Sequence, residues 1–536
     1  MIPVLTAAGR TVLTVASAFA LCGAILGSWT LAGIGCGVLL ALLWFYVATL
    51  PIPRILRKER LEFAWWIPHG PSGVVTPRVP FPVICYLANR TSSSFRTARI
   101  EVFRSDSLDV EGAEKLSVAV PAGQRVEFRL DATARAAGRA FLHGLALTLE
   151  GPLGLCRVHV YFPSSVSVKV FPRAAASRRA PLGPPVGVAE ERAGGHFVRQ
   201  RGTGAEIREI REHRSGDPFK AIAWKATART GRLMVRELEN EIQARRYAIV
   251  DVSSTMRGGD PGARKLDHAI EVAASYLRIA SERNDRFGLV TFDTRIVTHL
   301  ALAEGRPALL RAFDALVHAT AVVDEDLTEA GTPEVVVAVA EYVRHQEGLD
   351  FRIRDEGGRR IYDLSGLARH AQRAIAKEAP GFEIVATDPA IASLRRFCRA
   401  KGIPLPPRGD PPFGQKDGGL LEALRAVAAR GGPGATVVIV SDLEALERWD
   451  VALGELRRMR TRGQRVTCVV PFAPLFTDAP KGTAEEKVQA LFGREEERRV
   501  ERIELRLASA GVPVVRMSPQ DVPALVFART ALRRAS

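Results

Sequence analysis

The chain has 536 residues, of which 47% are hydrophobic and 25% charged; this composition excludes a wholly disordered protein and predicts two or three domains. Lysine and arginine outnumber the acids by 75 to 59, a formal net charge of +16, but no nucleic-acid-binding signature accompanies the charge, so a basic surface facing an anionic membrane is favoured. The six cysteines are scattered singly, which excludes a zinc ribbon or a disulfide framework.

Residues 1–52 predict a two-helix membrane anchor. The segment 11–50 contains no charged residue, and forty residues suit two spans of about 20 each. A turn at Gly27-Ser28-Trp29 places the helices at 11–26 and 30–50. Two G-x-x-x-G pairs fit close helix packing, with small residues in apolar helices as the alternative: Gly23 with Gly27, and Gly33 with Gly37.

The charges that flank the anchor predict its orientation. Arg10 precedes the first helix, and four basic residues follow the second: Arg54, Arg57, Lys58 and Arg60. By the positive-inside rule, both termini and all soluble domains lie in the cytoplasm, at the bacterial inner membrane. A cleaved signal peptide is disfavoured because the second apolar segment would still anchor the product.

Residues 61–175 predict a β-sandwich. Seven short segments alternate apolar and polar residues and are separated by Gly, Pro, Asn or Asp, from "PFPVICYLANRT" to "SVSVKVFP". This rhythm is typical of an immunoglobulin-like antiparallel sandwich, although the Cys–Trp–Cys core is absent. Because no catalytic constellation lies in it, a spacer or docking role is expected.

Residues 176–245 predict a linker followed by a dense polar block. Pro, Ala and Arg dominate its first part, and the block carries seven candidate partner-binding residues: Arg208, Arg211, Arg214, Asp217, Trp224, Lys225 and Arg229. Two interpretations stay open. The block is either a solvated helix and turn held by local ion pairs, or a charged docking surface with Trp224 as a buried anchor.

Residues 246–536 predict a doubly wound α/β domain. Strands such as "RRYAIVDVS", "RFGLVTFD" and "ATVVIVSDLEAL" alternate with amphipathic helices, a pattern typical of a mainly parallel sheet. Asp251 and Asp442 each follow one of these strands, so both should lie at the carboxyl edge of the sheet, where ligands bind.

The stretch "DVSST" predicts a metal site at that edge. Asp251, Ser253 and Thr255 offer hard oxygen donors on one turn, and Asp442 adds a carboxylate through a bound water. Such donors suit Mg²⁺, with Mn²⁺ and Ca²⁺ as alternative ions. One coordination position would stay open for an acidic group of a partner; a capped turn is the simpler interpretation.

These residues resemble a known adhesion site. "DVSST" is similar to the D-x-S-x-S signature of the metal-ion-dependent adhesion site in von Willebrand factor A domains, with Thr255 replacing the last serine, and "VVIVSDLE" is similar to that domain's later strand and aspartate. The order of anchor, sandwich, polar block and α/β domain resembles the bacterial domain-of-unknown-function family 58. The resemblance implies a protein-binding module that accompanies a MoxR-type AAA+ ATPase in the assembly or activation of other proteins.

The chain departs from this resemblance between Asp324 and Gly434. This connection of about 110 residues is much longer than usual. It predicts a helical, basic insertion at about 344–432. The resemblance implies a threonine ligand from the loop that precedes the later strand. Thr328 is the favoured candidate and Asp417 the alternative.

Enzymatic interpretations fit less well. A Mg²⁺-dependent phosphohydrolase would need a second carboxylate as general acid where Ser253 stands. A serine hydrolase elbow and a nucleotide-binding P-loop are also absent from the sequence. The expectation is therefore a non-enzymatic, membrane-anchored module that binds a partner's carboxylate through Mg²⁺. The alternative is an envelope scaffold with a degenerate metal site.

Overall fold

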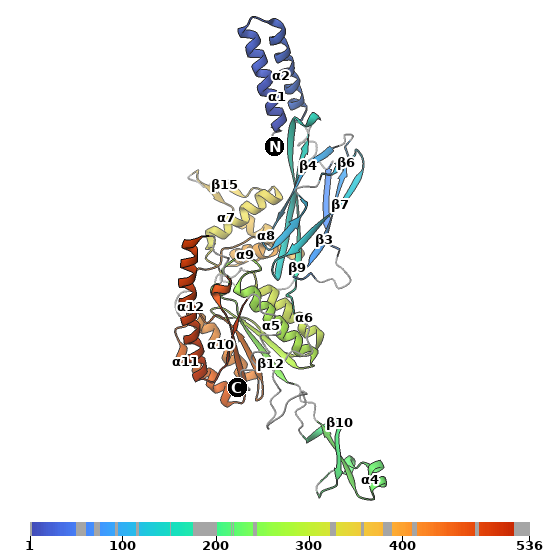
Figure 1. Cartoon of the computed structure of the whole chain (residues 1–536), viewed down its shortest axis with the longest axis vertical. Coiled ribbons are helices and arrows are strands. Elements are labelled where there is room, and N and C mark those ends of the chain that lie inside the picture. Colours follow the sequence, from blue (N-terminus) through green and yellow to red (C-terminus); the bar gives the residue numbers. More distant parts are fainter. Residues whose placement is uncertain are drawn as a thin grey trace. The chain divides into compact units, whose positions relative to one another are not determined.

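The computed structural model describes residues 3–49, 61–68, 75–91, 95–113, 117–150, 152–174, 201–215, 217, 219–239, 244–321, 328–354, 358–378, 388–409, 415–476 and 482–518. The chain forms two compact units, 1–171 with 321–406 and 172–320 with 407–536. Figure 1 shows the elements of both. The four basic residues that follow the anchor lie outside the described residues. The linker 176–200 also lies outside them, and the polar block is described from Arg201 onward.

Two apolar helices open the first unit. They are α1 (Ala7–Ile25) and α2 (Trp29–Thr49), and both are long and apolar enough to cross a membrane. The side chain of Thr6 caps α1 by accepting a hydrogen bond from the amide of Gly9 at 3.1 Å. The preceding strand β1 (Val4–Leu5) pairs with β9 (Cys156–Val170), so the start of α1 is joined to a sheet of the same unit.

The close approach of the two helices depends on glycines that the predicted motifs identify only in part. A Cβ on Gly23 would lie 2.3 Å from the amide nitrogen of Ala32, and one on Gly35 would lie 2.4 Å from that of Ala20. A Cβ on Gly27, Gly33 or Gly37 would have no such neighbour within 4 Å. Gly23 and Gly35 are therefore the positions where backbones meet, because only glycine leaves room there.

Two antiparallel sheets form the rest of the N-terminal part. Their orders are β1-β9-β8-β4-β6 and β2-β3-β7-β5. Buried residues of both sheets, including Leu87 and Leu130 from one and Ile100 and Leu147 from the other, share a single core. The strands not yet given are β2 (Leu61–Trp66), β3 (Pro80–Asn89), β4 (Phe95–Arg104), β5 (Leu108–Glu111), β6 (Ala119–Val120), β7 (Arg125–Ala134) and β8 (Gly138–Glu150).

One strand is longer than the sequence pattern predicts. The sequence pattern predicts two segments here, "CRVHVYFP" and "SVSVKVFP", with a break after Pro163. Strand β9 instead runs unbroken through Pro163. Pro163 lies opposite Gly144, where the register between β8 and β9 shifts. A proline is tolerated at such an irregularity because the missing amide is not needed for the ladder.

The inserted helices belong to this first unit. Their core includes Val339, Leu367 and Leu394, and the edge of the Tyr342 ring packs against His143 of β8 with centroids 5.8 Å apart. The elements are α7 (Thr332–Tyr342), the π-helical η6 (Val343–Glu347), β15 (Arg352–Arg354), β16 (Arg360–Tyr362), α8 (Leu364–Glu378) and α9 (Pro389–Lys401).

The insertion thus differs in extent from the predicted 344–432. Residues 321–406 cluster with the sheets of the first unit, whereas 407–432 stay with the second. The reason is that helix α10 (Gln415–Arg430) places Leu420 and Leu424 in the core of the second unit's large sheet.

The polar block forms a small sheet of its own within the second unit. Strand β10 (Arg201–Glu212) pairs antiparallel with β11 (Met234–Glu239). Between them lie a short 3-10 helix η4 (Phe219–Ala221) and helix α4 (Trp224–Thr230).

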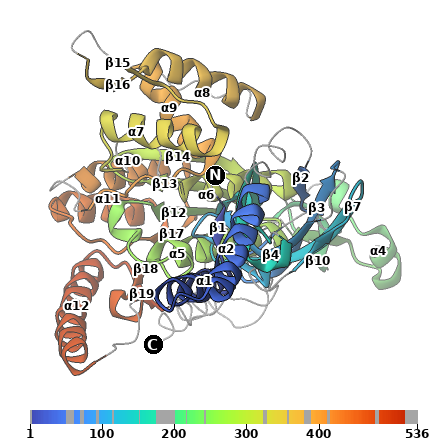
Figure 2. The ribbon, with the colours of Figure 1, turned by 90° about the horizontal axis from the view of Figure 1, so that it is seen from above.

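The second unit is built on a six-stranded sheet of order β14-β13-β12-β17-β18-β19. Strand β14 is antiparallel to β13, and all other pairs are parallel. Figure 2 shows α5 and α6 on one face of this sheet and α10 and α11 on the other. The bounds are β12 (Arg245–Asp251), β13 (Arg286–Phe292), β14 (Ile296–Ala303), β17 (Thr436–Val440), β18 (Arg465–Pro471), β19 (Val514–Met517), α5 (Lys265–Glu282), α6 (Gly305–Ala319), α11 (Trp449–Thr461) and α12 (Thr483–Ser509).

This strand order determines where a site can form. In sequence, β12 is the first strand of the sheet and β17 the fourth, and they are hydrogen-bonded neighbours. The chain leaves β12 toward one side of the sheet and continues from β17 toward the other. At such a switch point the loops beyond the carboxyl ends diverge and leave space for functional side chains.

Candidate functional site

The predicted residues of "DVSST" and Asp442 meet at the switch point. Asp251 is the last residue of β12, and Asp442 lies two residues beyond β17. The Thr255 hydroxyl donates to Oδ1 of Asp442 at 3.2 Å, and the Ser253 and Thr255 hydroxyl oxygens are 3.1 Å apart. Asp251, Ser253 and Asp442 are each 0% exposed. The sequence prediction that these four residues converge is correct.

A lysine that the sequence analysis did not select stands at the centre of this cluster. The ammonium of Lys416, in the first turn of α10, lies 2.5 Å from Oδ2 of Asp251 and 2.6 Å from Oδ1 of Asp442. It also donates to the Thr255 hydroxyl at 3.0 Å. Its side chain is 1% exposed, so the charge is compensated entirely by these protein groups.

A second lysine completes the charge balance. Lys265, at the start of α5, places its ammonium 2.8 Å from Oδ2 of Asp442 and 3.5 Å from the exposed Glu444. Burial alone would raise the pKa of Asp442, but Lys416 and Lys265 hold that pKa well below its usual value. Burial alone would lower the pKa of Lys416, but Asp251 and Asp442 raise it. The cluster therefore places the side chains of two aspartates and two lysines in direct contact.

The oxygens of the two aspartates also accept hydrogen bonds from neutral donors. Oδ1 of Asp251 accepts from the amide of Ser253 at 2.9 Å, and its Oδ2 accepts from the hydroxyl of Ser441 at 2.6 Å. Oδ1 of Asp442 accepts from the amide of Glu444 at 3.1 Å. Every carboxylate oxygen of the pair thus has a partner within the chain, as buried acceptors require.

The loop after Asp442 has an unusual backbone. Leu443 and Ala445 have φ values of 52° and 57°, in the left-handed region that residues with a side chain rarely adopt. The amide of Leu443 donates to the Ser441 hydroxyl at 3.0 Å, and Arg499 of α12 donates to the carbonyl of Asp442 at 2.9 Å. These contacts hold the loop in a conformation that it would not adopt alone.

A buried arginine fixes the turn on the other side of the site. Arg257 donates to the carbonyls of Val252 and Ala319, both at 2.8 Å. Burial lowers the pKa of Arg257 to about 10. The turn that carries Ser253 and Thr255 is therefore tied to the end of α6.

Neither candidate for the third ligand joins the cluster. Thr328 belongs to the other unit, where its hydroxyl donates to the carbonyl of Pro406 at 2.6 Å. Asp417 lies next to Lys416, but its carboxylate accepts from the amides of Glu447 and Arg448 at 3.0 and 3.2 Å. Asp417 therefore positions the start of α10 against the loop, and only its neighbour reaches the site.

The predicted Mg²⁺ does not fit this arrangement of side chains. The two aspartates and two hydroxyls are suitable hard donors, but the Lys416 ammonium stands between the two carboxylates where an ion would bind them. Among the described residues no group of three or more His, Cys, Asp or Glu side chains could hold a metal. The donor set resembles a metal site, and its cation is a lysine.

The polar block offers a second candidate surface. Arg211 and Asp217 form a bidentate pair at 2.8 and 2.7 Å, and Asp217 also accepts from the amide of Arg214. These hydrogen bonds hold the pKa of Asp217 well below its usual value. This pair therefore shapes the loop between β10 and α4, in agreement with the local ion-pair interpretation.

Trp224 is not the buried anchor that was considered. Trp224 is 57% exposed, and Phe219, which sequence reasoning missed, is 73% exposed. The two rings form an edge-to-face contact with their centroids 5.5 Å apart. The same segment of the chain carries four exposed cations: Arg214, Lys220, Lys225 and Arg229. The strand position of Arg208 is described, but its side chain lies outside the described residues.

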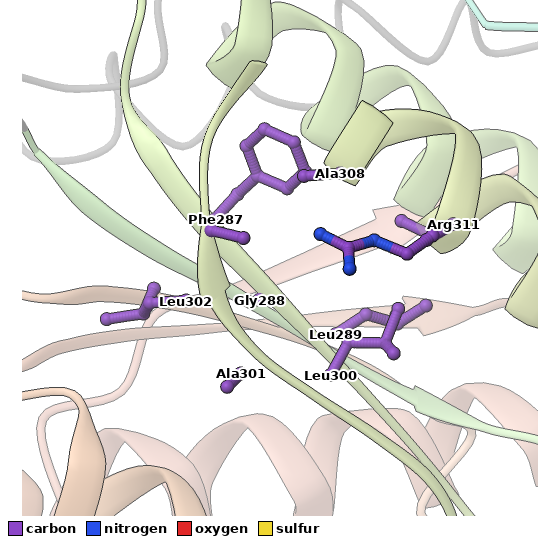
Figure 3. Close-up of a pocket in the computed structure, with 10 residues that line it drawn as sticks. Phe287, Gly288, Leu289, Leu300, Ala301, Leu302, Ala308 and Arg311 are labelled. Atoms are coloured by element: carbon purple, nitrogen blue, oxygen red, sulfur yellow. The ribbon is translucent and has the colours of Figure 1, made fainter. Parts of the chain in front are cut away.

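A small cavity lies elsewhere in the second unit, between β13, β14 and α6. Its volume is about 180 Å³. Figure 3 shows Arg311 reaching from α6 into the space beside Phe287 and Leu289. The lining apart from Arg311 is apolar, so the cavity brings no set of catalytic side chains together. Its volume is also smaller than that of typical ligand sites.

Comparison with known proteins finds a family model that matches about a quarter of the chain and gives no function. The family model "Protein of unknown function DUF58" matches residues 209–343, which include the polar block from its ninth residue onward and the turn with Asp251, Ser253 and Thr255. "Uncharacterized protein Rv1480" of Mycobacterium tuberculosis and "Uncharacterized protein Mb1516" of Mycobacterium bovis are each 28% identical over 140 residues, 26% of this chain and 44% of theirs. The match therefore spans less than half the length of these relatives.

Solved structures add no functional argument. A FixG-related protein from Vibrio parahaemolyticus is similar over 21% of this chain and 97% of its own, at 9% identity and a TM-score of 0.15. The native conformation of an Escherichia coli alpha-2-macroglobulin is similar over 81% of this chain and 26% of its own, at 10% identity and a TM-score of 0.19.

Proposed function

We propose that this chain is a membrane-anchored protein-binding module whose contact surface is the polar block. The observation that carries the proposal is the Phe219–Trp224 pair, 73% and 57% exposed, in a segment that also carries exposed cations. Large aromatic side chains and arginines dominate binding hot spots. In residues 210–236 the acids Glu212 and Asp217 are paired with Arg232 and Arg211. The remaining exposed cations of this segment favour a partner with an acidic surface.

The switch-point cluster supports a binding role over an enzymatic one. A catalytic carboxylate or amine needs a free lone pair or proton directed at a substrate. At this site the carboxylates of Asp251 and Asp442 and the ammonium of Lys416 are buried and bonded to one another. We therefore propose no reaction at this edge of the sheet, and no phosphohydrolase activity.

The anchor supports attachment with the soluble parts on one side of a membrane. Strand β1 precedes α1 and pairs with β9, so the N-terminus and the two antiparallel sheets would share a side if the two helices form a spanning hairpin. Orientation toward the cytoplasm rests on the flanking basic residues of the sequence and is part of the proposal.

The identity of the partner comes from the family resemblance. The strand order of the six-stranded sheet, with an antiparallel edge strand, supports the resemblance to von Willebrand factor A domains. The proposed partner is accordingly a MoxR-type AAA+ ATPase or one of its clients. An envelope scaffold that binds through the polar block is the second candidate, and the lysine in the donor set favours it over Mg²⁺-dependent adhesion.

The test replaces Phe219 with a photo-crosslinking phenylalanine analogue in the full-length, membrane-embedded protein. The control places the analogue at Trp66 of β2, another exposed aromatic position, which is 58% exposed compared with 73% for Phe219. A discrete crosslinked protein is expected at position 219 and not at 66, and Trp224→Ala should reduce its yield. Equal crosslinking at both positions, or none at 219, would contradict the proposed surface. Direct binding to the purified ATPase would then identify or exclude that partner, with Trp224→Ala expected to weaken it at least about tenfold.

A further inference from the structure

We infer that Lys416 is the resident cation of the switch-point cluster, so that this site holds its carboxylates together without a metal ion. The inference concerns the cluster of Asp251, Thr255, Asp442 and Lys416 and is independent of the proposed contact surface in the polar block.

The coordination of the Lys416 ammonium is complete. A lysine ammonium has three N–H donors and no acceptor. The three nearest acceptors are Asp251 at 2.5 Å, Asp442 at 2.6 Å and the Thr255 hydroxyl at 3.0 Å. Each donor therefore has one partner. These are three of the five groups that the sequence assigns to a metal, so the ammonium and an ion would compete for the same oxygens.

The positive and negative charges of the cluster are also balanced. Asp251 and Asp442 carry two negative charges, and Lys416 and Lys265 supply the same two positive charges that one divalent ion would bring. Both carboxylates are 0% exposed, and the two lysine side chains are 1% and 12% exposed. A divalent ion added to this neutral cluster would leave an excess of two buried positive charges, which is strongly unfavourable away from water.

The start of α10 is fixed on two sides, which keeps Lys416 in place. Asp417 accepts the amides of Glu447 and Arg448. On the other side, a Cβ on Gly419 would lie 2.1 Å from the carbonyl oxygen of Asp293, so the helix is in close contact with the turn after β13. Asp417 is thus a positioning residue for Lys416, and "QKDGG" places a lysine, its anchor and the close-contact glycine within one helical turn.

The test measures metal binding by the full-length protein in detergent. Mn²⁺ binding is followed by the loss of its free-ion electron paramagnetic resonance signal, and thermal unfolding is compared in Mg²⁺ and in EDTA. The wild type is expected to bind no Mn²⁺ at this site and to unfold at the same temperature in both buffers. Lys416→Met removes the ammonium and leaves both carboxylates and both hydroxyls, so it should gain one Mn²⁺ and be stabilised by Mg²⁺.

The matched control is Lys265→Met, which removes an equal charge from the same cluster but leaves its centre filled. It should bind no Mn²⁺. One Mn²⁺ bound by the wild type and lost in Asp251→Asn would overturn the inference, and so would equal Mn²⁺ binding by both lysine variants. If Lys416→Met does not fold, the comparison of Mn²⁺ binding between the wild type and Asp251→Asn still tests the inference. A folded Lys416→Met that gains no ion would also contradict it.

Discussion

Removal of the Lys416 ammonium should destabilise the second unit more than removal of the Lys265 ammonium. In Lys416→Met, two carboxylates that are both 0% exposed lose the cation that they share at 2.5 and 2.6 Å. Breaking a buried ion pair by removing one partner costs about 3–5 kcal/mol, because the remaining charge is uncompensated. Asp442 keeps Lys265, but Asp251 keeps only its neutral donors, so a cost within this range is expected.

Lys265→Met provides the comparison. Its ammonium is 12% exposed and contacts one buried carboxylate, which Lys416 still neutralises. The loss corresponds to one hydrogen bond to a charged group, about 1.5–3 kcal/mol. The difference between the two variants therefore isolates the contribution of the central position from that of positive charge alone.

Native-state hydrogen exchange is the appropriate assay, because it reports on β12 and β17 separately from the first unit in the same protein. With EDTA present, amides of β12 should exchange roughly one hundred to a few thousandfold faster in Lys416→Met than in the wild type. Amides of β3 and β7 serve as an internal reference and should be unchanged. Protection of β12 in Lys416→Met equal to that in Lys265→Met would refute the reasoning.

Three further predictions concern the first unit and the anchor. Gly23→Leu should lower the melting temperature in detergent, with an overpacking cost of about 1–3 kcal/mol, whereas Gly33→Leu, which faces open space, should leave it unchanged; equal effects would contradict the assigned contact. Burial lowers the pKa of His143, so the unfolded chain binds more protons and stability should fall as the pH drops below about 6.5. In His143→Phe the dependence of melting temperature on pH in that range should flatten. An unchanged slope would exclude His143 as the source of the pH dependence. In intact membrane vesicles a charged maleimide should label neither Cys22 nor Cys36, and labelling of either would place its helix outside the bilayer. The other cysteines are buried, and burial raises the pKa of Cys85, Cys398 and Cys468 to about 12, so they should react only after denaturation.

The elements of the α/β unit could be predicted because their signals are local. The strand that ends at Asp251 and the strand before Asp442 are continuous apolar runs, and the helices between them have period-3.6 faces. Parallel strands place their carboxyl ends at one edge, so the meeting of Asp251 with Asp442 follows from topology. The same reasoning identified two apolar helices near the N-terminus.

The position of Lys416 could not be predicted in this way. It lies at the start of a helix after a long insertion, and the register of that helix against the sheet depends on Asp417 and on the close contact at Gly419. Asp417 was the alternative to Thr328 as a metal ligand, but its carboxylate binds backbone amides, and the adjacent lysine enters the site. The signal available in retrospect is a lysine beside a helix-start aspartate.

The insertion was misplaced for a related reason. Its helices carry ordinary amphipathic patterns, which reveal that a face is buried but not against what. Their contact with the antiparallel sheets depends on side chains far apart in sequence, such as Tyr342 against His143 and Gln346 with Tyr161. Thr328 belongs to the same unit as these helices, and its hydroxyl donates to the carbonyl of Pro406.

The cluster has a structural consequence that is independent of any metal. Leu443 and Ala445 are held in the left-handed region, at a cost of roughly 1–2 kcal/mol each. The groups that oppose this cost are Ser441 and Asp442, which accept the amides of Leu443 and Glu444, and Asp442 is oriented for that role by the two lysines. The energy expected from the Lys416 contacts is comparable with the strain of the loop. The buried lysine therefore maintains the shape of the edge that exposes Glu444, a role that a bound metal would fill only while the ion was present.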